Sequence, residues 1–172
     1  MILNEYIACI CEGSAEHAIM HLLLESDKLI FAKEQLLNED VLRCRSAKNF
    51  ERLYLRKDFK KKITVLRILD SRNEIFKLSK QYENKISVID IITAPEIEML
   101  IIHSEDKYNN FIKSKKKPSE FCKTNLGIRN VKNYKFVMEY FNDVNKLVDS
   151  IRKYRKKANL KNDEKTLCDL LK

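Results

Sequence analysis

The sequence has little of what tight turns and phosphate-binding loops require. Its 172 residues include two Gly and two Pro, which predicts that most of the chain is regular secondary structure. With so few glycines it carries no Gly-rich phosphate loop, and neither a Walker sequence nor GxGxxG occurs. The GxSxG elbow of serine hydrolases is missing as well. The common nucleotide-binding and serine-hydrolase motifs are therefore excluded.

Long apolar runs and paired cysteines are also lacking. No stretch of about 18 uncharged apolar residues occurs, so we expect no contact with a membrane. Glu5 near the start, without a basic segment, argues against a secretory signal peptide. The five cysteines form no CxxC pair, which predicts a reducing cytoplasm and no structural zinc. Cys11 lies in an apolar run beside no basic group, which disfavours a reactive thiolate.

Acidic residues are scarce only in the last third of the chain. Residues 1–112 hold 17 Lys and Arg against 18 Asp and Glu, whereas residues 113–172 hold 17 against 7. The net charge of +9 therefore comes from the last third. A localised basic excess is typical of a surface that binds nucleic acid, although a lysine-rich solvated surface is the alternative. The candidate nucleic-acid-binding residues are Lys115, Lys116, Lys117, Arg152, Lys153, Arg155, Lys156 and Lys157.

What the sequence does contain is a set of apolar runs that end on acidic residues. Residues 6–11 run directly into Glu12, and residues 63–69 run directly into Asp70. Continuous apolar runs of this length are typical of strands covered on both faces of a parallel sheet. Ligand sites in such sheets lie beyond the carboxyl ends of the strands. We therefore expect Glu12 and Asp70 to lie close together, where they can share Mg²⁺ or Mn²⁺.

Strands and helices alternate along the first two thirds of the chain. This order predicts an α/β fold with a mainly parallel sheet and helices on both faces. We expect an α/β core over residues 1–112 and a basic helical C-terminal extension over residues 113–172, packed on that core. The expected strands are 6–11, 41–45, 63–69 and 86–92, and the expected helices are 14–25, 46–59, 73–82, 96–112, 119–126, 133–157 and 163–171. The broad apolar stripe of the helix over 133–157 would allow a homodimer.

Further polar residues follow these strand ends. Glu16 lies in the first turn of the predicted helix after Glu12, and Glu98 lies in the helix after the last strand. Arg72, two residues beyond Asp70, is the best placed cation to stabilise a transition state. Arg67 can face either side of its strand, and His103, five residues after Glu98, is as readily a surface residue as a catalytic one. The structural alternative is that Glu12 and Asp70 only cap helices, and that Glu16 is a capping or solvated residue.

Three segments together resemble the topoisomerase-primase (TOPRIM) domain of RloB-like proteins and OLD-family nucleases. They are ICEGSAE at 10–16, LDS at 69–71 and APEIEMLIIH at 94–103. The resemblance implies a TOPRIM-like sheet and a Mg²⁺- or Mn²⁺-dependent nuclease in prokaryotic anti-phage defence, often with a partner ATPase. It implies metal ligands at Glu12, Glu16 and Asp70, and catalytic roles for Glu12, Asp70 and Glu98, whereas Arg72 is a catalytic candidate from its place in the sequence alone.

One position departs from the family pattern. The later motif of the family is typically Asp-x-Asp, and here Arg72 stands at the third position. Glu74 is a candidate replacement for the missing acid. Three hypotheses therefore stand: a metal-dependent endonuclease acting on DNA or RNA, a catalytically degenerate module that binds nucleic acid or an ATPase partner, and a structural or toxin-regulating partner protein that binds no nucleic acid.

Overall fold

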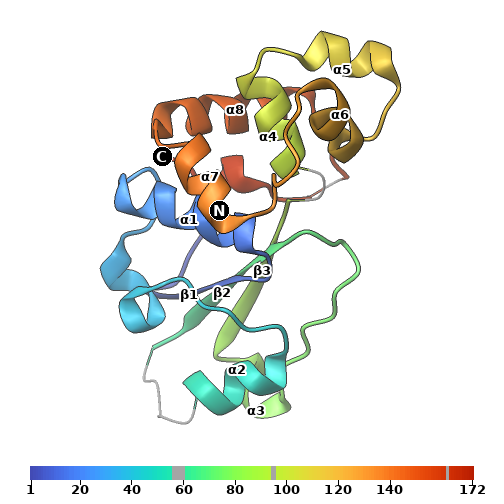
Figure 1. Cartoon of the computed structure of the whole chain (residues 1–172). Helices are drawn as coiled ribbons and strands as arrows, with labels where there is room; N and C mark the ends of the chain where they lie inside the picture. The colour runs from blue at the N-terminus through green and yellow to red at the C-terminus, as the bar shows by residue number, and fades with distance from the viewer. Residues whose placement is uncertain (56–60, 94–95, 162) are drawn as a thin grey trace.

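The fold is described from a computed structural model, which covers residues 1–55, 61–93, 96–161 and 163–172. Three parallel strands form one sheet in the order β1-β2-β3: β1 (Tyr6–Cys11), β2 (Ile63–Leu69) and β3 (Ile86–Ile92). Helices cover both faces of this sheet (Figure 1). The predicted α/β fold with a mainly parallel sheet is thereby confirmed.

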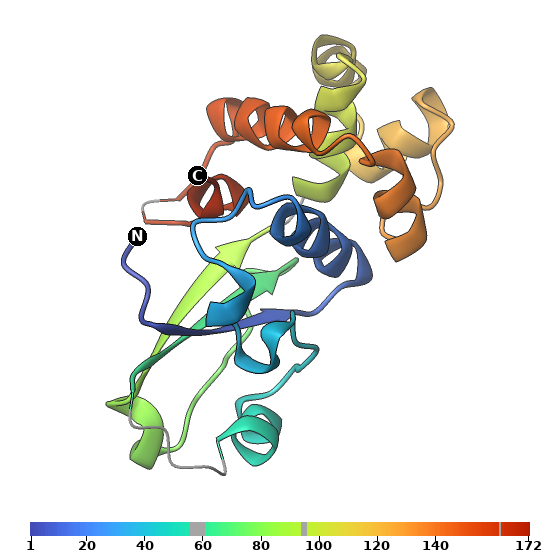
Figure 2. The same cartoon turned by 90° about the vertical axis from the view of Figure 1, so that its left-hand side faces the viewer.

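One face of the sheet carries most of the helices. α1 (Ser14–Glu25) and α4 (Glu96–Ser104) lie on this face, and they pack against α7 (Tyr134–Tyr140) and α8 (Val144–Lys157), respectively. α6 (Pro118–Asn125) also contacts α4, and α5 (Tyr108–Ser114) lies beside both (Figure 2). Buried side chains of β1, α1, α4 and α8 belong to one continuous hydrophobic core. The C-terminal third therefore shares its core with the sheet.

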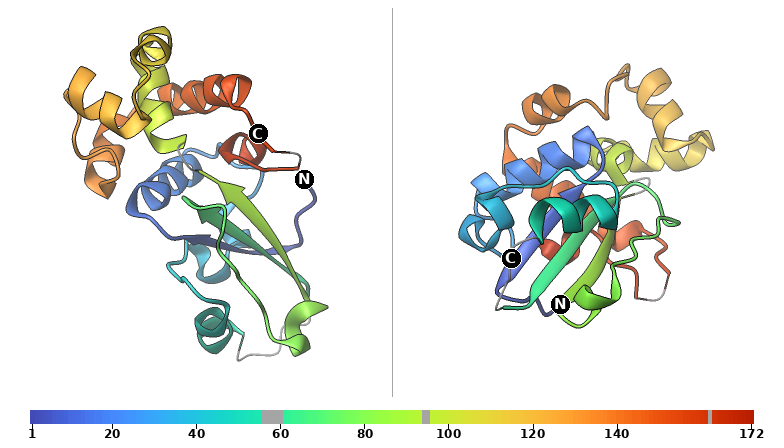
Figure 3. Two further views of the ribbon diagram at one scale, coloured as in Figure 1. Left: turned by 90° about the vertical axis from the view of Figure 1, so that its right-hand side faces the viewer. Right: turned by 90° about the horizontal axis from the view of Figure 1, so that it is seen from below.

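The other face is covered more thinly. α2 (Ala47–Tyr54) crosses it, and α3 (Lys80–Glu83) lies near its edge (Figure 3). Phe50 of α2 is fully buried there against Ala8, Ile10 and Val65. Ser46 caps α2 by accepting a hydrogen bond from the backbone N–H of Asn49, as the sequence predicts. The rest of the helix predicted to reach residue 59 lies outside the described residues, as does Pro95 before α4.

The strand predicted at residues 41–45 is wrong. Leu42 makes a single parallel bridge to Ile10 of β1, with backbone bonds of 2.7 and 2.9 Å to Cys9 and Cys11. The segment leaves the sheet after Leu42. Arg43 and Arg45 are exposed, and Ser46 is the N-cap of α2. The alternation that predicted a strand reflects one edge contact of Leu42 and burial of Cys44.

Three of the predicted helices are shorter than expected. The helix over 133–157 is two helices, because Phe141 ends α7 and Asp143 caps α8. The helix from residue 96 to 112 is likewise interrupted, at Asp106, whose φ of 53° lies in the left-handed region. Residues 73–79 are irregular, so the helix predicted over 73–82 is reduced to α3.

The C-terminal segment forms an edge contact instead of the predicted helix over 163–171. A 3-10 turn, η3 (Leu167–Leu170), packs on α8, and Thr166 precedes it as its N-cap. Lys165 bridges Ile91 in parallel, and its carbonyl accepts a 2.8 Å hydrogen bond from the N–H of Ile92. This segment therefore covers part of the β3 edge. Two further 3-10 turns, η1 (Lys33–Gln35) and η2 (Leu37–Glu39), lie between α1 and α2.

No helix among the described residues is long and apolar enough to cross a membrane. Four of the five cysteines are buried, and Cys168 is partly buried. The apolar stripe of α8 is buried against α4 through Leu147, Ile151 and Tyr154. A homodimer therefore stays a prediction that would need another surface.

Candidate functional site

The three strands end at one edge of the sheet and bring polar residues together there. Cys11 pairs with Ile68, and Leu69 pairs with Ile92, so the register is nearly level at this edge. Glu12, Asp70 and Thr93 each follow a strand directly. The structure thereby brings Glu12 and Asp70 to the same edge, in the position where open α/β sheets bind ligands.

A cavity of about 270 Å³ lies at this edge. It is lined by Glu12, Gly13, Arg45, Asp70 and Glu74. Three of these side chains are carboxylates, and Arg45 supplies a positive charge. Glu74, the candidate replacement for the missing second aspartate, lines the same cavity as Asp70.

The pKa of Glu12 is raised by its surroundings. Burial and hydrogen bonding to Glu74 raise the pKa of Glu12 to about 7, with the negative charge of Glu74 adding to the shift. Arg67 opposes this effect and lowers the pKa. A carboxyl pair of this kind favours binding of a proton or another cation, because two adjacent carboxylates repel each other.

Arg67 of β2 is a buried cation beneath the cavity. Its side chain is 3% exposed, and its guanidinium lies 3.1 Å from Asp90 and 3.6 Å from Glu74. The same group lies over the ring of Phe76, 4.8 Å from its centroid. Arg67 thus ties Glu74, in an irregular segment, to the central strand of the sheet.

Glu16 is buried beside the cavity and does not line it. Its side chain accepts a hydrogen bond of 3.3 Å from the hydroxyl of Thr93, and the residue is 2% exposed. Burial raises the pKa of Glu16, and Asp70 adds to the rise, whereas the backbone N–H of Glu16 itself lowers it. A carboxylate in the first turn of α1 that bonds its own backbone matches the helix-capping alternative.

Glu98 and Asp70 are joined by a lysine that the sequence analysis missed. Lys132 Nζ lies 3.5 Å from Asp70 Oδ2 and 4.0 Å from Glu98 Oε1. Lys132 also lowers the pKa of Glu16. It stands in the connection between α6 and α7, and no spacing or motif links it to residues 62 and 34 positions earlier. Sequence alone therefore carries no signal for this contact.

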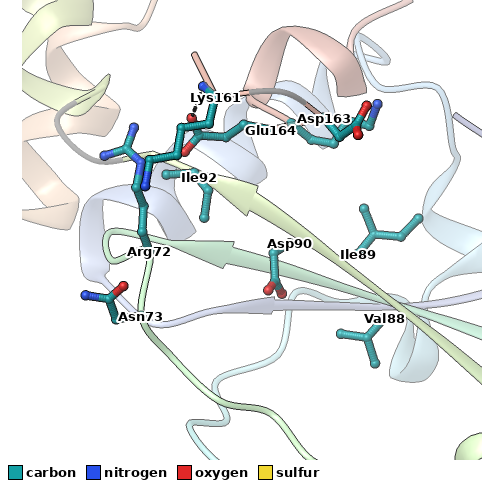
Figure 4. A pocket seen from close by; sticks show the side chains of 10 residues that line it. Arg72, Asn73, Val88, Ile89, Asp90, Ile92, Lys161, Asp163 and Glu164 are labelled. Atoms are coloured by element: carbon teal, nitrogen blue, oxygen red, sulfur yellow. Dashed lines mark hydrogen bonds and ion pairs between the residues drawn. The ribbon is translucent and has the colours of Figure 1, made fainter. Parts of the chain in front are cut away.

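Arg72 belongs to a different cavity. Its Nε lies 2.6 Å from Glu164 Oε1, in a cavity of about 440 Å³ between the end of β2, the edge of β3 and the C-terminal segment. Figure 4 shows Arg72 pointing toward Glu164 and Lys161. The position of Arg72 therefore does not support its predicted role, which was to stabilise a transition state beside Glu12 and Asp70.

The donor set at the sheet edge fits a hard divalent cation, because Glu12, Asp70 and Glu74 all offer carboxylate oxygens to one cavity. Yet among the residues that the structure describes, no three His, Cys, Asp or Glu side chains stand close enough to hold a metal ion. The contacts of these acidic side chains with other charged groups accompany this separation. Glu12 is paired with Glu74, and Lys132 stands between Asp70 and Glu98.

The predicted nucleic-acid-binding residues fall into two groups. Lys115, Lys116 and Lys117 connect α5 to α6, and Lys116 donates hydrogen bonds of 2.9 Å to Thr124 and Asn125. The other five occupy the last two turns of α8. Within the described parts of the chain, three of these five have hydrogen-bond or ion-pair partners, namely Asp106 for Lys153, the carbonyl of Lys172 for Arg152, and Asp169 for Arg155.

A second polar cluster, near α1, was not anticipated. His21 contacts the hydroxyl of Tyr134 through Nδ1 at 2.9 Å and Asp40 through Nε2 at 3.0 Å. The ring of His17 lies 4.3 Å from that of His21, and burial lowers the pKa of His17. These contacts tie α1 to α7 and to the connection before α2.

His103 is buried, so the alternative of a surface histidine is wrong. The residue is 4% exposed and stacks on Tyr108 at the far end of α4 from Glu98.

No match was found for this chain in comparisons with protein-family models, with curated proteins or with solved structures.

Proposed function

We propose that this protein is a metal-dependent phosphodiesterase that cleaves nucleic acid at the cavity lined by Glu12, Asp70 and Glu74. The observation that carries the proposal is that these three carboxylates line one cavity at the carboxyl edge of a parallel sheet. A Mg²⁺ or Mn²⁺ ion bound there would polarise the phosphodiester and lower the pKa of a bound water.

The chain's own residues have separable tasks in this proposal. Glu12, Asp70 and Glu74 would bind the cation through their carboxylate oxygens. Arg45, which lines the cavity, would hold a phosphate oxygen of the nucleic acid. Lys132, beside Asp70 and Glu98, would offset the negative charge of the substrate.

Cleavage in the presence and absence of metal tests this proposal. Plasmid DNA and single-stranded RNA are incubated with the protein in Mg²⁺, in Mn²⁺ and in EDTA. We expect cleavage of at least one substrate with metal, none in EDTA, and loss of cleavage with retained binding in Glu12→Gln. Glu83→Gln, an exposed acid on α3, serves as the matched control and should cleave like the wild type. Absence of cleavage under every metal condition contradicts the proposal.

The alternative function is a nucleic-acid-binding module without catalysis. The observation that favours it is Lys132, whose ammonium group already stands between Asp70 and Glu98. Such a module would bind nucleic acid equally in EDTA and in Mg²⁺, and its affinity would fall steeply with salt. A cytoplasmic role in anti-phage defence with a partner ATPase is proposed from the TOPRIM resemblance alone.

A further inference from the structure

A third cavity, of about 320 Å³, lies at the end of α4 away from the acidic cluster of Glu12, Asp70 and Glu74. Its walls come from the last turn of α4, the start of α5 and the last two turns of α8, which gather at one end of the molecule (Figure 1). The lining residues are His103, Asp106, Tyr108, Asn109, Lys153, Lys156 and Lys157. This cavity shares no residue with the one at the sheet edge.

The cavity carries an excess of positive charge. Three lysines line it against one acid, Asp106, which lies 2.9 Å from Lys153. Lys157 stands over the ring of Tyr108, 5.7 Å from its centroid. Lys156 is exposed and forms no ion pair within the described parts of the chain. Two of the three ammonium groups are therefore free of carboxylate partners among those residues.

His103 adds a buried polar group without a partner. The residue is 4% exposed, and within the described chain its Nε2 has no hydrogen-bond partner. Its ring is stacked on Tyr108, with centroids 4.9 Å apart and planes at 11°. Buried polar atoms are nearly always hydrogen-bonded in native proteins, so the unpaired Nε2 marks His103 as the unusual residue among those that line this cavity.

We propose that this cavity binds a phosphate group. A tetrahedral oxyanion offers several acceptor oxygens at once, which matches three lysines that have donors only and a histidine that can donate. The volume is sufficient for a phosphate together with part of a nucleoside. The same chemistry is presented by a free nucleotide and by the backbone or end of a nucleic-acid strand.

The competing explanation is that the lysines only complement the carboxyl end of α8. Cations in the last turn of a helix are stabilised by its dipole and need no ligand. That explanation accounts for the charge, but it leaves the burial and the missing partner of His103 Nε2 unexplained. The proposal does not rest on the nuclease function, because none of its residues belongs to the acidic cluster.

The test uses the full chain and inorganic phosphate as the first probe. Burial and the nearby charges of Lys153 and Lys157 lower the pKa of His103, opposed by Asp106, so a bound anion should raise it. We expect the His103 ring protons, followed by NMR, to titrate at higher pH with phosphate than with chloride at equal ionic strength. The chain has three histidines, and His103→Gln identifies the signal.

Calorimetry with charge variants locates the binding. The double variant Lys156→Gln/Lys157→Gln should weaken phosphate binding by about tenfold or more, since each lysine supplies a charge-assisted hydrogen bond. Lys135→Gln, at an exposed lysine of α7, is the matched control and should bind like the wild type. An unchanged His103 titration together with equal binding heats for all variants would overturn the proposal.

Two further ligands distinguish the sources of the phosphate. A nucleoside 5′-monophosphate and single-stranded oligonucleotides with and without a 5′-phosphate are titrated into the wild type and the double variant. Tighter binding of the monophosphate identifies a nucleotide site, and tighter binding of an oligonucleotide identifies a strand-binding site. Either result supports the proposal if the double variant weakens it, and metal-dependent cleavage remains a separate readout.

Discussion

At the residue scale, Gly13 and Glu16 show why the turn after β1 needs a glycine. The backbone of Gly13 is extended, so its φ of −89° is open to any residue. The restriction is space, because a Cβ at Gly13 would lie 1.9 Å from Oε2 of Glu16. The Glu16 carboxylate is buried and bonded to Thr93, so it cannot move without losing that partner.

Gly13→Ala should therefore destabilise the protein by about 1–3 kcal/mol, the cost of leaving a buried polar group unsatisfied. The reason is displacement of the Glu16 carboxylate from Thr93. Urea denaturation measures the loss in the wild type and in a Glu16→Ala background. The penalty should largely disappear in Glu16→Ala, and an equal penalty in both backgrounds would show that Glu16 is not the cause.

Glu12 gives the stability of the fold a pH dependence. Burial and Glu74 raise its pKa from 4.5 to about 7, so the folded state holds the proton more tightly than the unfolded state. The stabilisation from this proton is complete below the unfolded pKa and is lost as pH rises through the folded pKa. Glu12→Gln should therefore gain stability relative to wild type as pH rises from 4.5 to about 7, the two pKa values of Glu12.

The measurement is urea unfolding of both proteins across this pH range. Comparing the two proteins removes the contribution of His17, whose pKa is lowered by burial. Glu83→Gln, at an exposed acid of α3, should keep the wild-type pH slope. A constant stability difference between wild type and Glu12→Gln at all pH values would argue against the raised pKa.

At the scale of elements, the strands were predictable and several helix ends were not. Residues 6–11 are a continuous apolar run, residues 63–69 and 86–92 are largely apolar, and each forms a strand with those bounds. The α7–α8 break escaped prediction because apolar residues recur at helical spacing on both sides of it, while the break depends on the Asp143 cap. The alternation of apolar and polar residues over 41–45 predicted a strand that does not form. The pattern extends over five residues, whereas only Leu42 bridges to the sheet, at Ile10.

Asp143 is the residue that starts α8, and its removal tests this assignment. Its side chain accepts a hydrogen bond of 3.0 Å from the N–H of Asn145. Asp143→Ala should lower the free energy of unfolding by about 1 kcal/mol, as expected for loss of an N-cap. Asp149→Ala, at an exposed acid inside the same helix, should change it by less than about 0.5 kcal/mol. Equal effects would mean that Asp143 does not cap α8.

The candidate site was predictable to the extent that it follows the strands. Glu12 and Asp70 were identified because they end apolar runs, and the parallel register brings them together. Lys132 and Arg67 were not, because the contact of Lys132 is long-range and the side that Arg67 faces depends on what packs against β2. Arg72 was expected at the acids from its closeness in sequence, yet its side chain turns toward Glu164.

At the scale of the whole molecule, the basic C-terminal third is part of the fold and not an appendage. Ile151 of α8 is fully buried in the same core as Ile7 and Leu66 of the sheet. The predicted division at residues 112 and 113 stays a prediction about charge and function. The core itself continues across that boundary, through the packing of α8 and α6 on α4.

Ile151→Ala should therefore destabilise the whole protein by about 2–5 kcal/mol, the usual cost of truncating a buried isoleucine. Because the core is shared, circular dichroism and intrinsic tyrosine fluorescence should report one coincident unfolding transition. Ile112→Ala, at an isoleucine of α5 that is 54% exposed, is the matched control and should have little effect. Two separate transitions in Ile151→Ala would instead indicate an independent C-terminal domain.

Calorimetric titration of Mn²⁺ and Mg²⁺ tests the central claim, a cation site built from Glu12, Asp70 and Glu74. The wild type is compared with Glu12→Gln and Asp70→Asn, and with Glu83→Gln as the control. We expect saturable binding in the wild type and the control, and its loss in both site variants. Absence of binding at millimolar metal, or binding that both variants retain, would contradict the account and leave Glu12 and Asp70 with structural roles.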